Sequence, residues 1–166
     1  MKKILAGMIF ASLFSLLACS INEEEMQTAT IDQTKKTFTS KPAAANEESD
    51  SFKYHLPEGY KVESAKNNNL IFKRDDEQFI LFVNDKEKED STVFYDSLLE
   101  QYKDPIVKET FEDKDRFGYV LVDKLEEDEY EVSAGIGGVK MTTQTDGRNV
   151  ADTAQQMMEI VSSVIY

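Results

Sequence analysis

The sequence predicts an α+β domain over residues 51–166, with an antiparallel sheet of about seven strands, one mid-chain helix and one C-terminal helix. Two observations support this class. Short segments in which apolar and polar residues alternate recur between turn-forming residues, which is typical of antiparallel strands. Two longer segments space their apolar residues three and four positions apart, which is typical of helices that pack on a sheet. A signal peptide and a disordered linker are predicted to precede the domain.

The strands are predicted in chain order between recognisable turns. Pro57-Glu58-Gly59 and the three asparagines at 67–69 are turn-forming sequences. The run at 79–83 is apolar on both faces and is therefore expected in the middle of the sheet, and the run at 117–122 is also apolar on both faces. Gly137-Gly138 is expected to break or bulge the last strand. The predicted strands are residues 52–56, 60–64, 70–73, 79–83, 107–111, 117–122 and 130–143.

Two helices are predicted from apolar residues at helical spacing. A helix at 92–102 has one apolar face, formed by Tyr95, Leu98, Leu99 and Tyr102. Asn149 is expected to begin a closing helix, whose apolar stripe is wide enough to cover a sheet. This stripe consists of Ala151, Ala154, Met158, Val161 and Ile165, widened by Met157, Ile160 and Val164.

The order of these elements resembles the Mog1/PsbP-like fold, which includes the bacterial DcrB-type and PsbP-like proteins. The resemblance covers residues 51–166 and rests on the opening segment from Phe52 to Tyr60, the mid-chain helix, the late meander and the C-terminal helix. It implies an accessory or binding role rather than catalysis. It supplies no functional residue that can be carried over to this chain.

Residues 1–18 predict a secretory signal peptide. Lys2 and Lys3 give a positive start, and residues 4–17 are apolar or small throughout. This run is shorter than the roughly 20 apolar residues that a membrane-spanning helix needs. A positive start, a short apolar centre and a small final residue are typical of a cleaved export signal. The alternative is a buried N-terminal helix, and the lack of a polar face counts against it.

Leu16-Leu17-Ala18-Cys19 resembles the lipobox of bacterial lipoproteins, in which an aliphatic residue, a tolerant position and a small residue precede a cysteine. Cys19 is the only cysteine of the chain. The resemblance implies that Cys19 receives a diacylglyceryl thioether and becomes the N-terminus after cleavage. Two acyl chains hold a protein stably, whereas one binds only marginally. The expected location is the outer face of the cell membrane, or the outer membrane where the host has two.

Residues 19–50 predict a disordered linker after the lipidated N-terminus. The stretch is rich in acidic residues, Thr, Gln and Lys, and it shows no sustained apolar period. Such a composition buries too little surface to offset the entropy of ordering. A flexible chain of this length would span about 30 Å on average, so the domain is expected to stand clear of the lipid head groups.

The charge of the chain excludes some partners. The net charge of −13 becomes −15 once residues 1–18 are removed, because 17 basic and 32 acidic residues remain. This charge argues against nucleic acid and against electrostatic binding to anionic lipid. It favours a cationic partner. With Cys19 lipidated, no disulfide can form, and the domain depends on its core alone.

No set of residues predicts catalysis, a metal site or a cofactor. His55 is the only histidine and is expected to face solvent from a strand, so neither a catalytic triad nor a zinc site is supported. The acidic runs 75–77 and 126–129 are expected at hairpin tips, where they could hold Ca²⁺ weakly, but they lack the spacing of a calcium loop. The glycines of 135–138 superficially resemble a phosphate loop, but no helix follows them.

The sequence therefore favours a lipid-anchored, non-enzymatic domain that binds or helps to assemble another envelope protein. A small-molecule or ion-binding lipoprotein is the alternative, and an envelope hydrolase is less favoured because it would need acids with shifted pKa values in one cleft. A deep, polar-lined pocket would favour the small-molecule alternative. A filled core with an exposed apolar patch would favour a protein partner.

Replacing the predicted lipidation residue tests the anchor directly. Cys19→Ser is expected to abolish lipid incorporation and lipoprotein-type cleavage, because only a thiol can form the thioether. Metabolic labelling with a palmitate analogue and fractionation of membranes measure both effects, and Ser20→Ala is the matched control. Normal processing of Cys19→Ser with an unchanged membrane fraction would contradict the prediction.

Overall fold

The computed structural model describes residues 22–66 and 68–166 and confirms the predicted α+β class. Its main sheet has seven antiparallel strands, with one mid-chain helix and one C-terminal helix as expected. The helices are α1 (Glu23–Thr39), α2 (Val93–Gln101) and α3 (Val150–Ser162). The strands are β1 (Glu47–Glu48), β2 (Lys53–Tyr54), β3 (Lys61–Lys66), β4 (Asn69–Arg74), β5 (Glu77–Val83), β6 (Val107–Glu112), β7 (Phe117–Glu126), β8 (Glu129–Ile136) and β9 (Val139–Asp146).

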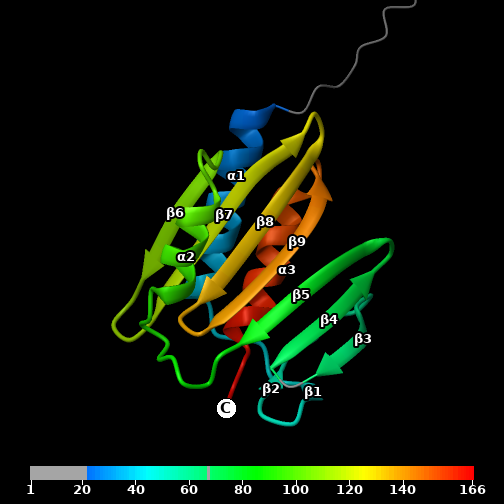
Figure 1. Cartoon of the computed structure of the whole chain (residues 1–166), viewed down its shortest axis with the longest axis vertical. Helices are drawn as coiled ribbons and strands as arrows, with labels where there is room; N and C mark the ends of the chain where they lie inside the picture. The colour runs from blue at the N-terminus through cyan, green and yellow to red at the C-terminus, as the bar shows by residue number, and fades with distance from the viewer. Residues whose placement is uncertain (1–21, 67) are drawn as a thin grey trace, which may run out of the picture.

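The main sheet joins two meanders at its centre. Its strand order is β3-β4-β5-β9-β8-β7-β6, so the last strand of the chain lies beside β5 (Figure 1). At this junction Leu81 pairs with Met141, and both side chains are fully buried. The prediction that residues 79–83 form a central strand is confirmed. The run at 117–122 lies in β7, one strand from the sheet edge.

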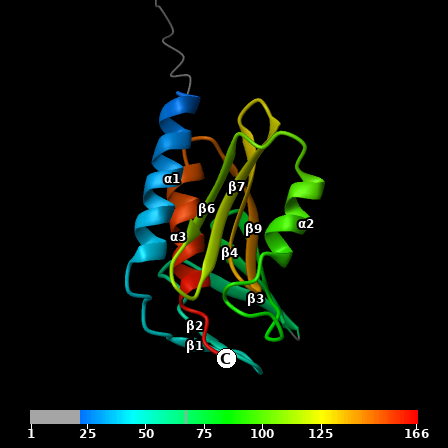
Figure 2. The same cartoon turned by 90° about the vertical axis from the view of Figure 1, so that its left-hand side faces the viewer.

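The helices cover both faces of the sheet. α1 and α3 pack against each other on one face of the sheet, the inner face, and α2 lies on the opposite, outer face (Figure 2). Strand alternation directs Phe79, Leu81 and Val83 of β5 toward the inner face, where they are buried. The fully buried Met157 and Met158 of α3 complete this core.

Of the two outcomes expected at Gly137-Gly138, the structure shows the break, a two-residue hairpin turn that divides the run 130–143 into two strands. Gly137 has a φ of +51°, and a Cβ there would lie 2.3 Å from the carbonyl oxygen of Lys88. One other strand prediction is corrected. The run 52–56 is not part of the main sheet. Only β2 is extended there, and it pairs with β1.

The closing helix is shorter than predicted. α3 ends at Ser162, so Ile165 does not continue its apolar stripe. Ile165 instead pairs with Lys53 through two backbone hydrogen bonds, with N···O distances of 2.8 and 2.9 Å. The C-terminal segment thus extends the small β1–β2 sheet by one bridge.

The prediction of a disordered linker over 19–50 is wrong for the residues that the structure describes. The 17-residue helix α1 occupies more than half of that stretch, and Asn22 caps it by accepting hydrogen bonds from the backbone N–H groups of Glu24 and Glu25. β1 orders a further part of the stretch. Because α1 and β1 order much of this stretch, it cannot act as the flexible linker of about 30 Å that the sequence predicts.

The buried face of α1 explains why the sequence shows no apolar pattern typical of a helix here. Its residues lie four positions apart, but two of the four are threonines. Thr30 donates its hydroxyl to the carbonyl oxygen of Met26 at 2.7 Å, and Thr34 donates to that of Thr30 at 2.6 Å. Each hydroxyl is satisfied within the helix, so the side chains can be buried against α3. The fourth residue, Phe38, is 1% exposed.

None of the helices within 22–66 and 68–166 has the length and apolar character needed to cross a membrane.

Phe38→Ala tests whether α1 belongs to the folded domain. The Phe38 ring lies 5.8 Å from that of Phe111 and would collide with any Cβ at Gly118, so its loss leaves a cavity. The free energy of unfolding should fall by about 3–5 kcal/mol. Urea unfolding followed by circular dichroism measures it, and Lys35→Ala on the exposed face of the same helix should change it little. Equal stability of the two variants would mean that α1 is a dispensable appendage.

Candidate functional site

The predicted lipidation residue, Cys19, lies outside the described residues. Its distance along the chain from the folded domain is nevertheless informative. Only Ser20 and Ile21 separate Cys19 from Asn22, the N-cap of α1. Even a fully extended chain spans at most about 11 Å over these three steps. A lipid on Cys19 would therefore hold the start of α1 close to the bilayer.

His55 does not face solvent from a strand, and this prediction is corrected. β2 ends at Tyr54, and the side chain of His55 is only 23% exposed. Its Nδ1 lies 3.1 Å from the carbonyl oxygen of Ala44, and its Nε2 lies 3.6 Å from Oε1 of Glu159. His55 thus connects the α1–β1 segment to α3. Neither contact of the ring is with a serine, threonine or cysteine side chain, so the contacts indicate a structural role for His55.

The two acidic runs lie at hairpin tips, as predicted. Residues 75–77 form the β4–β5 turn and residues 126–129 the β7–β8 turn. In residues 22–66 and 68–166, no group of three or more His, Cys, Asp or Glu side chains is placed to hold a metal ion. The acidic side chains of the two turns add negative charge to the surface around them.

A cluster around Arg74, which the sequence did not reveal, fastens the β4–β5 hairpin to α3. The guanidinium donates to Oε2 of Glu77 at 2.6 Å and to Oγ1 of Thr153 at 3.2 Å. It also donates to the Gln156 side-chain oxygen and to the Tyr60 hydroxyl. Arg74 and Glu77 are each about one-fifth exposed, so the ion pair is largely removed from water.

The same guanidinium lies over two aromatic rings. Its central carbon is 5.2 Å from the ring centre of Tyr60 and 5.1 Å from that of Phe79. Burial raises the pKa of Tyr60 to about 12, so its hydroxyl stays protonated at neutral pH. Through these hydrogen bonds and ring contacts, the cluster acts as a structural joint between hairpin and helix.

The outer face of the sheet is covered only in part. α2 covers the β7 side, where Leu98 and Tyr102 pack with Tyr119 and Leu121. Beyond α2, no other helix within residues 22–66 and 68–166 lies on the outer faces of β4, β5 and β9 (Figure 1). There Ile80 pairs with Ile71 on one side and Thr142 on the other, and its side chain is 51% exposed.

An open groove of about 520 Å³ crosses this uncovered surface, and we call it the outer-face groove. It lies across β5, β9 and β8 and combines one apolar residue with several acids. Its main lining residues are Asp76, Gln78, Ile80, Glu129, Glu131 and Thr142. The alternation of β5 that directs Phe79 inward directs Ile80 into this groove.

One wall of the groove is held in place by a chain of hydroxyl groups. The buried Tyr102 hydroxyl donates to Oε1 of Glu131 and lies 3.0 Å from Oγ of Ser133, which in turn lies 2.9 Å from Oγ1 of Thr142. Burial, and then the hydrogen bond to Glu131, raise the pKa of Tyr102, so its hydroxyl keeps its proton. The Glu131 carboxylate is thereby oriented before any partner arrives. The groove can accept a cationic group beside an apolar one.

No protein-family model matches the chain, and no curated protein is similar enough to it to count as a match.

Arg74→Ala tests the structural role of the Arg74 cluster. Removing the guanidinium leaves the largely buried Glu77 carboxylate without its counter-charge, so the free energy of unfolding should fall by about 2–4 kcal/mol. Chemical unfolding measures the change. Arg148→Ala is the control, because Arg148 is 77% exposed in its pair with Asp146 and should matter little. A loss for Arg74→Ala no larger than that of the control would refute the structural role.

Proposed function

We propose that this chain is a lipid-anchored, non-enzymatic protein on the outer side of a bacterial membrane, and that it binds another envelope protein through the outer-face groove. The anchor is the lipid expected on Cys19. The observation that carries the docking part of the proposal is the half-exposed Ile80, which lies in an acidic groove on a sheet face that α2 leaves uncovered.

The apolar part of the surface extends beyond one residue. Ile71 is the direct cross-strand neighbour of Ile80, and Phe82 lies two positions further along the same face of β5. The Phe82 ring packs at 5.4 Å against Phe94 of α2, so the apolar strip continues to the edge of that helix. Single exposed apolar residues are common, but a continuous strip rimmed by charge is typical of a protein-binding surface.

The charge around the strip selects the kind of partner. Glu129, Glu131 and Asp76 line the groove, and the mature chain has a net charge of −15. A partner segment with Lys or Arg next to an apolar side chain would satisfy both parts of the groove. Charge of opposite sign would also speed association and reject acidic partners.

With a lipid on Cys19, the short connection to α1 would turn the start of that helix toward the bilayer. Lys124 of β7 lies 3.2 Å from Glu23 at the start of α1, so the adjacent β7–β8 turn belongs to the anchored end. Glu126, Glu127 and Asp128 of this turn would face lipid head groups. Because anionic lipids repel such a surface, the domain should touch the bilayer only through its lipid and leave its flank open to a partner.

Site-specific photocrosslinking tests the docking surface in cells. A photoreactive amino acid at position 80 should give a strong crosslink to one envelope protein, because a bound partner would cover Ile80. Position 62 is the matched control, since Val62 is also aliphatic, lies on the same sheet and is 43% exposed, but is outside the groove. The crosslinked peptide, identified by mass spectrometry, should carry Lys or Arg beside an apolar residue.

A second variant tests the contribution of charge. Glu131→Lys should weaken the crosslink from position 80 at least tenfold, because it places a cation where the partner's cation binds. The variant must keep a normal thermal unfolding midpoint for this comparison. Equal crosslinking from positions 62 and 80, or an acidic contacting segment in the partner, would overturn the proposal.

A further inference from the structure

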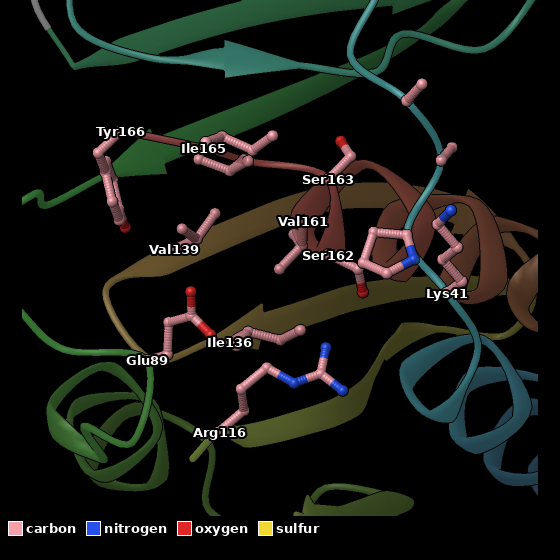
Figure 3. Close-up of a pocket in the computed structure, with 14 residues that line it drawn as sticks. Lys41, Glu89, Arg116, Ile136, Val139, Val161, Ser162, Ser163, Ile165 and Tyr166 are labelled. Carbon is pink, nitrogen blue, oxygen red and sulfur yellow. The ribbon is translucent and has the colours of Figure 1, made fainter.

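A cavity of about 400 Å³ lies at the end of the domain where the C-terminal residues meet the α1–β1 segment (Figure 3). It is separate from the outer-face groove and shares no residue with it. Its volume is within the range of small-molecule sites. Most of its wall is apolar and is formed by Pro42, Ile136, Val139, Val161, Val164 and Ile165.

One polar group in this wall is buried and has no partner. The hydroxyl of Ser162, at the end of α3, is shielded from solvent and makes no hydrogen bond within the described residues. Leaving a buried hydroxyl unpaired costs stability, so such a group calls for an explanation. In Figure 3 the Ser162 side chain lies at the wall of the cavity. Because the oxygen is shielded in this arrangement, a ligand atom would accept its hydrogen bond once the Ser162 side chain turns about χ1 toward the cavity.

Arg116 brings unused donors to the same cavity. Its Nε and Nη2 donate to Asp113, and Nη2 also donates to the carbonyl oxygen of Phe38 at 3.0 Å. The hydrogen bonds from Arg116 hold the pKa of Asp113 below its usual range, so the Asp113 carboxylate keeps its charge. The guanidinium carbon lies 4.5 Å above the Phe38 ring, which fixes its plane. Among the described residues, Nη1 of Arg116 makes no hydrogen bond.

The charges at the cavity are arranged asymmetrically. Ser162, Arg116 and Lys41 line one part of it, whereas the carboxylate of Glu89 lies on the other side of Ile136, toward Tyr166 (Figure 3). Lys41 is exposed at the rim and forms no ion pair within residues 22–66 and 68–166. One part of the cavity therefore offers hydrogen-bond donors and positive charge beside an apolar hollow.

We propose that this cavity binds a small anionic amphiphile. The apolar body lies against the valine and isoleucine side chains, and a carboxylate or phosphate head group accepts hydrogen bonds from Ser162 and Arg116 near Lys41. The cavity adjoins the C-terminal end of α1, which is about 25 Å from its start. The proposal does not depend on the lipid anchor or on the outer-face groove.

Binding of decanoate tests this site. Residues 19–166 with Cys19→Ser contain every described element and need no detergent, which would compete for the cavity. Calorimetry should give a Kd for decanoate at least tenfold lower than that for decyltrimethylammonium, which has the same apolar chain and the opposite charge. Binding of the cation as tight as that of decanoate would overturn the proposal.

Substitutions of two neighbouring serines distinguish an effect on decanoate binding from an effect on stability. Ser162→Ala should weaken decanoate binding about tenfold, because it removes a hydrogen bond to a charged group. The same change should leave the unfolding midpoint equal or higher, because it removes an unpaired buried hydroxyl. Ser163 also lines the cavity, but its hydroxyl accepts from His55 N at 2.8 Å and donates to the Ile160 carbonyl oxygen at 2.6 Å. Ser163→Ala should therefore lower the unfolding midpoint and keep decanoate binding.

Vesicles distinguish a free amphiphile from a lipid head group. Flotation with phosphatidylglycerol vesicles that depends on Ser162 would identify a membrane lipid as the ligand source, and decanoate binding without flotation would identify a free amphiphile. Either result supports the site. Decanoate affinity unchanged by Ser162→Ala would overturn it.

Discussion

The pairing of β5 with β9 is the constraint on which the rest of the fold depends. It joins the meander β3-β4-β5 to the meander β6-β7-β8-β9, and without it the chain would form two separate small sheets. Leu81 and Met141 meet there with no exposed surface. The same pairing places Ile80 next to Thr142 on the outer face, so the joint that builds the core also builds the outer-face groove.

The strands and two of the helices could be predicted because their patterns are local. The run at 79–83 predicts a central strand because it is apolar on both faces, and the structure confirms this. Its two faces, however, are apolar for different reasons. Phe79 and Leu81 face the core, whereas Ile80 faces a surface without a helix. α1 could not be predicted because Thr30 and Thr34 are buried by satisfying their hydroxyls on the helix itself, which polarity alone does not reveal.

The candidate sites were less accessible to sequence reasoning, because each is assembled across distant parts of the chain. The groove combines a turn at 75–77 with strands that begin at 129 and 139, and the cavity combines Lys41, Arg116 and Ser162. Periodicity predicts which face a residue occupies but not which other segments share that face. His55 illustrates the same limit, since its contacts with Ala44 and Glu159 depend on tertiary packing.

A lipid on Cys19, as proposed, would hold the domain close to a bilayer, because only Ser20 and Ile21 lie between Cys19 and the N-cap of α1, and the acidic β7–β8 turn would then lie toward the lipid. Because Cys19 is the only cysteine and would be blocked by lipid, an introduced cysteine can carry a single spin label. Relaxation by nickel-chelating lipids, measured on the lipidated protein in vesicles, compares labels at Thr28, near the start of α1, and Glu48, in β1 at the opposite end (Figure 1). If the start of α1 lies next to the bilayer, relaxation should be strong at position 28 and weak at position 48. Equal relaxation at both positions would contradict it.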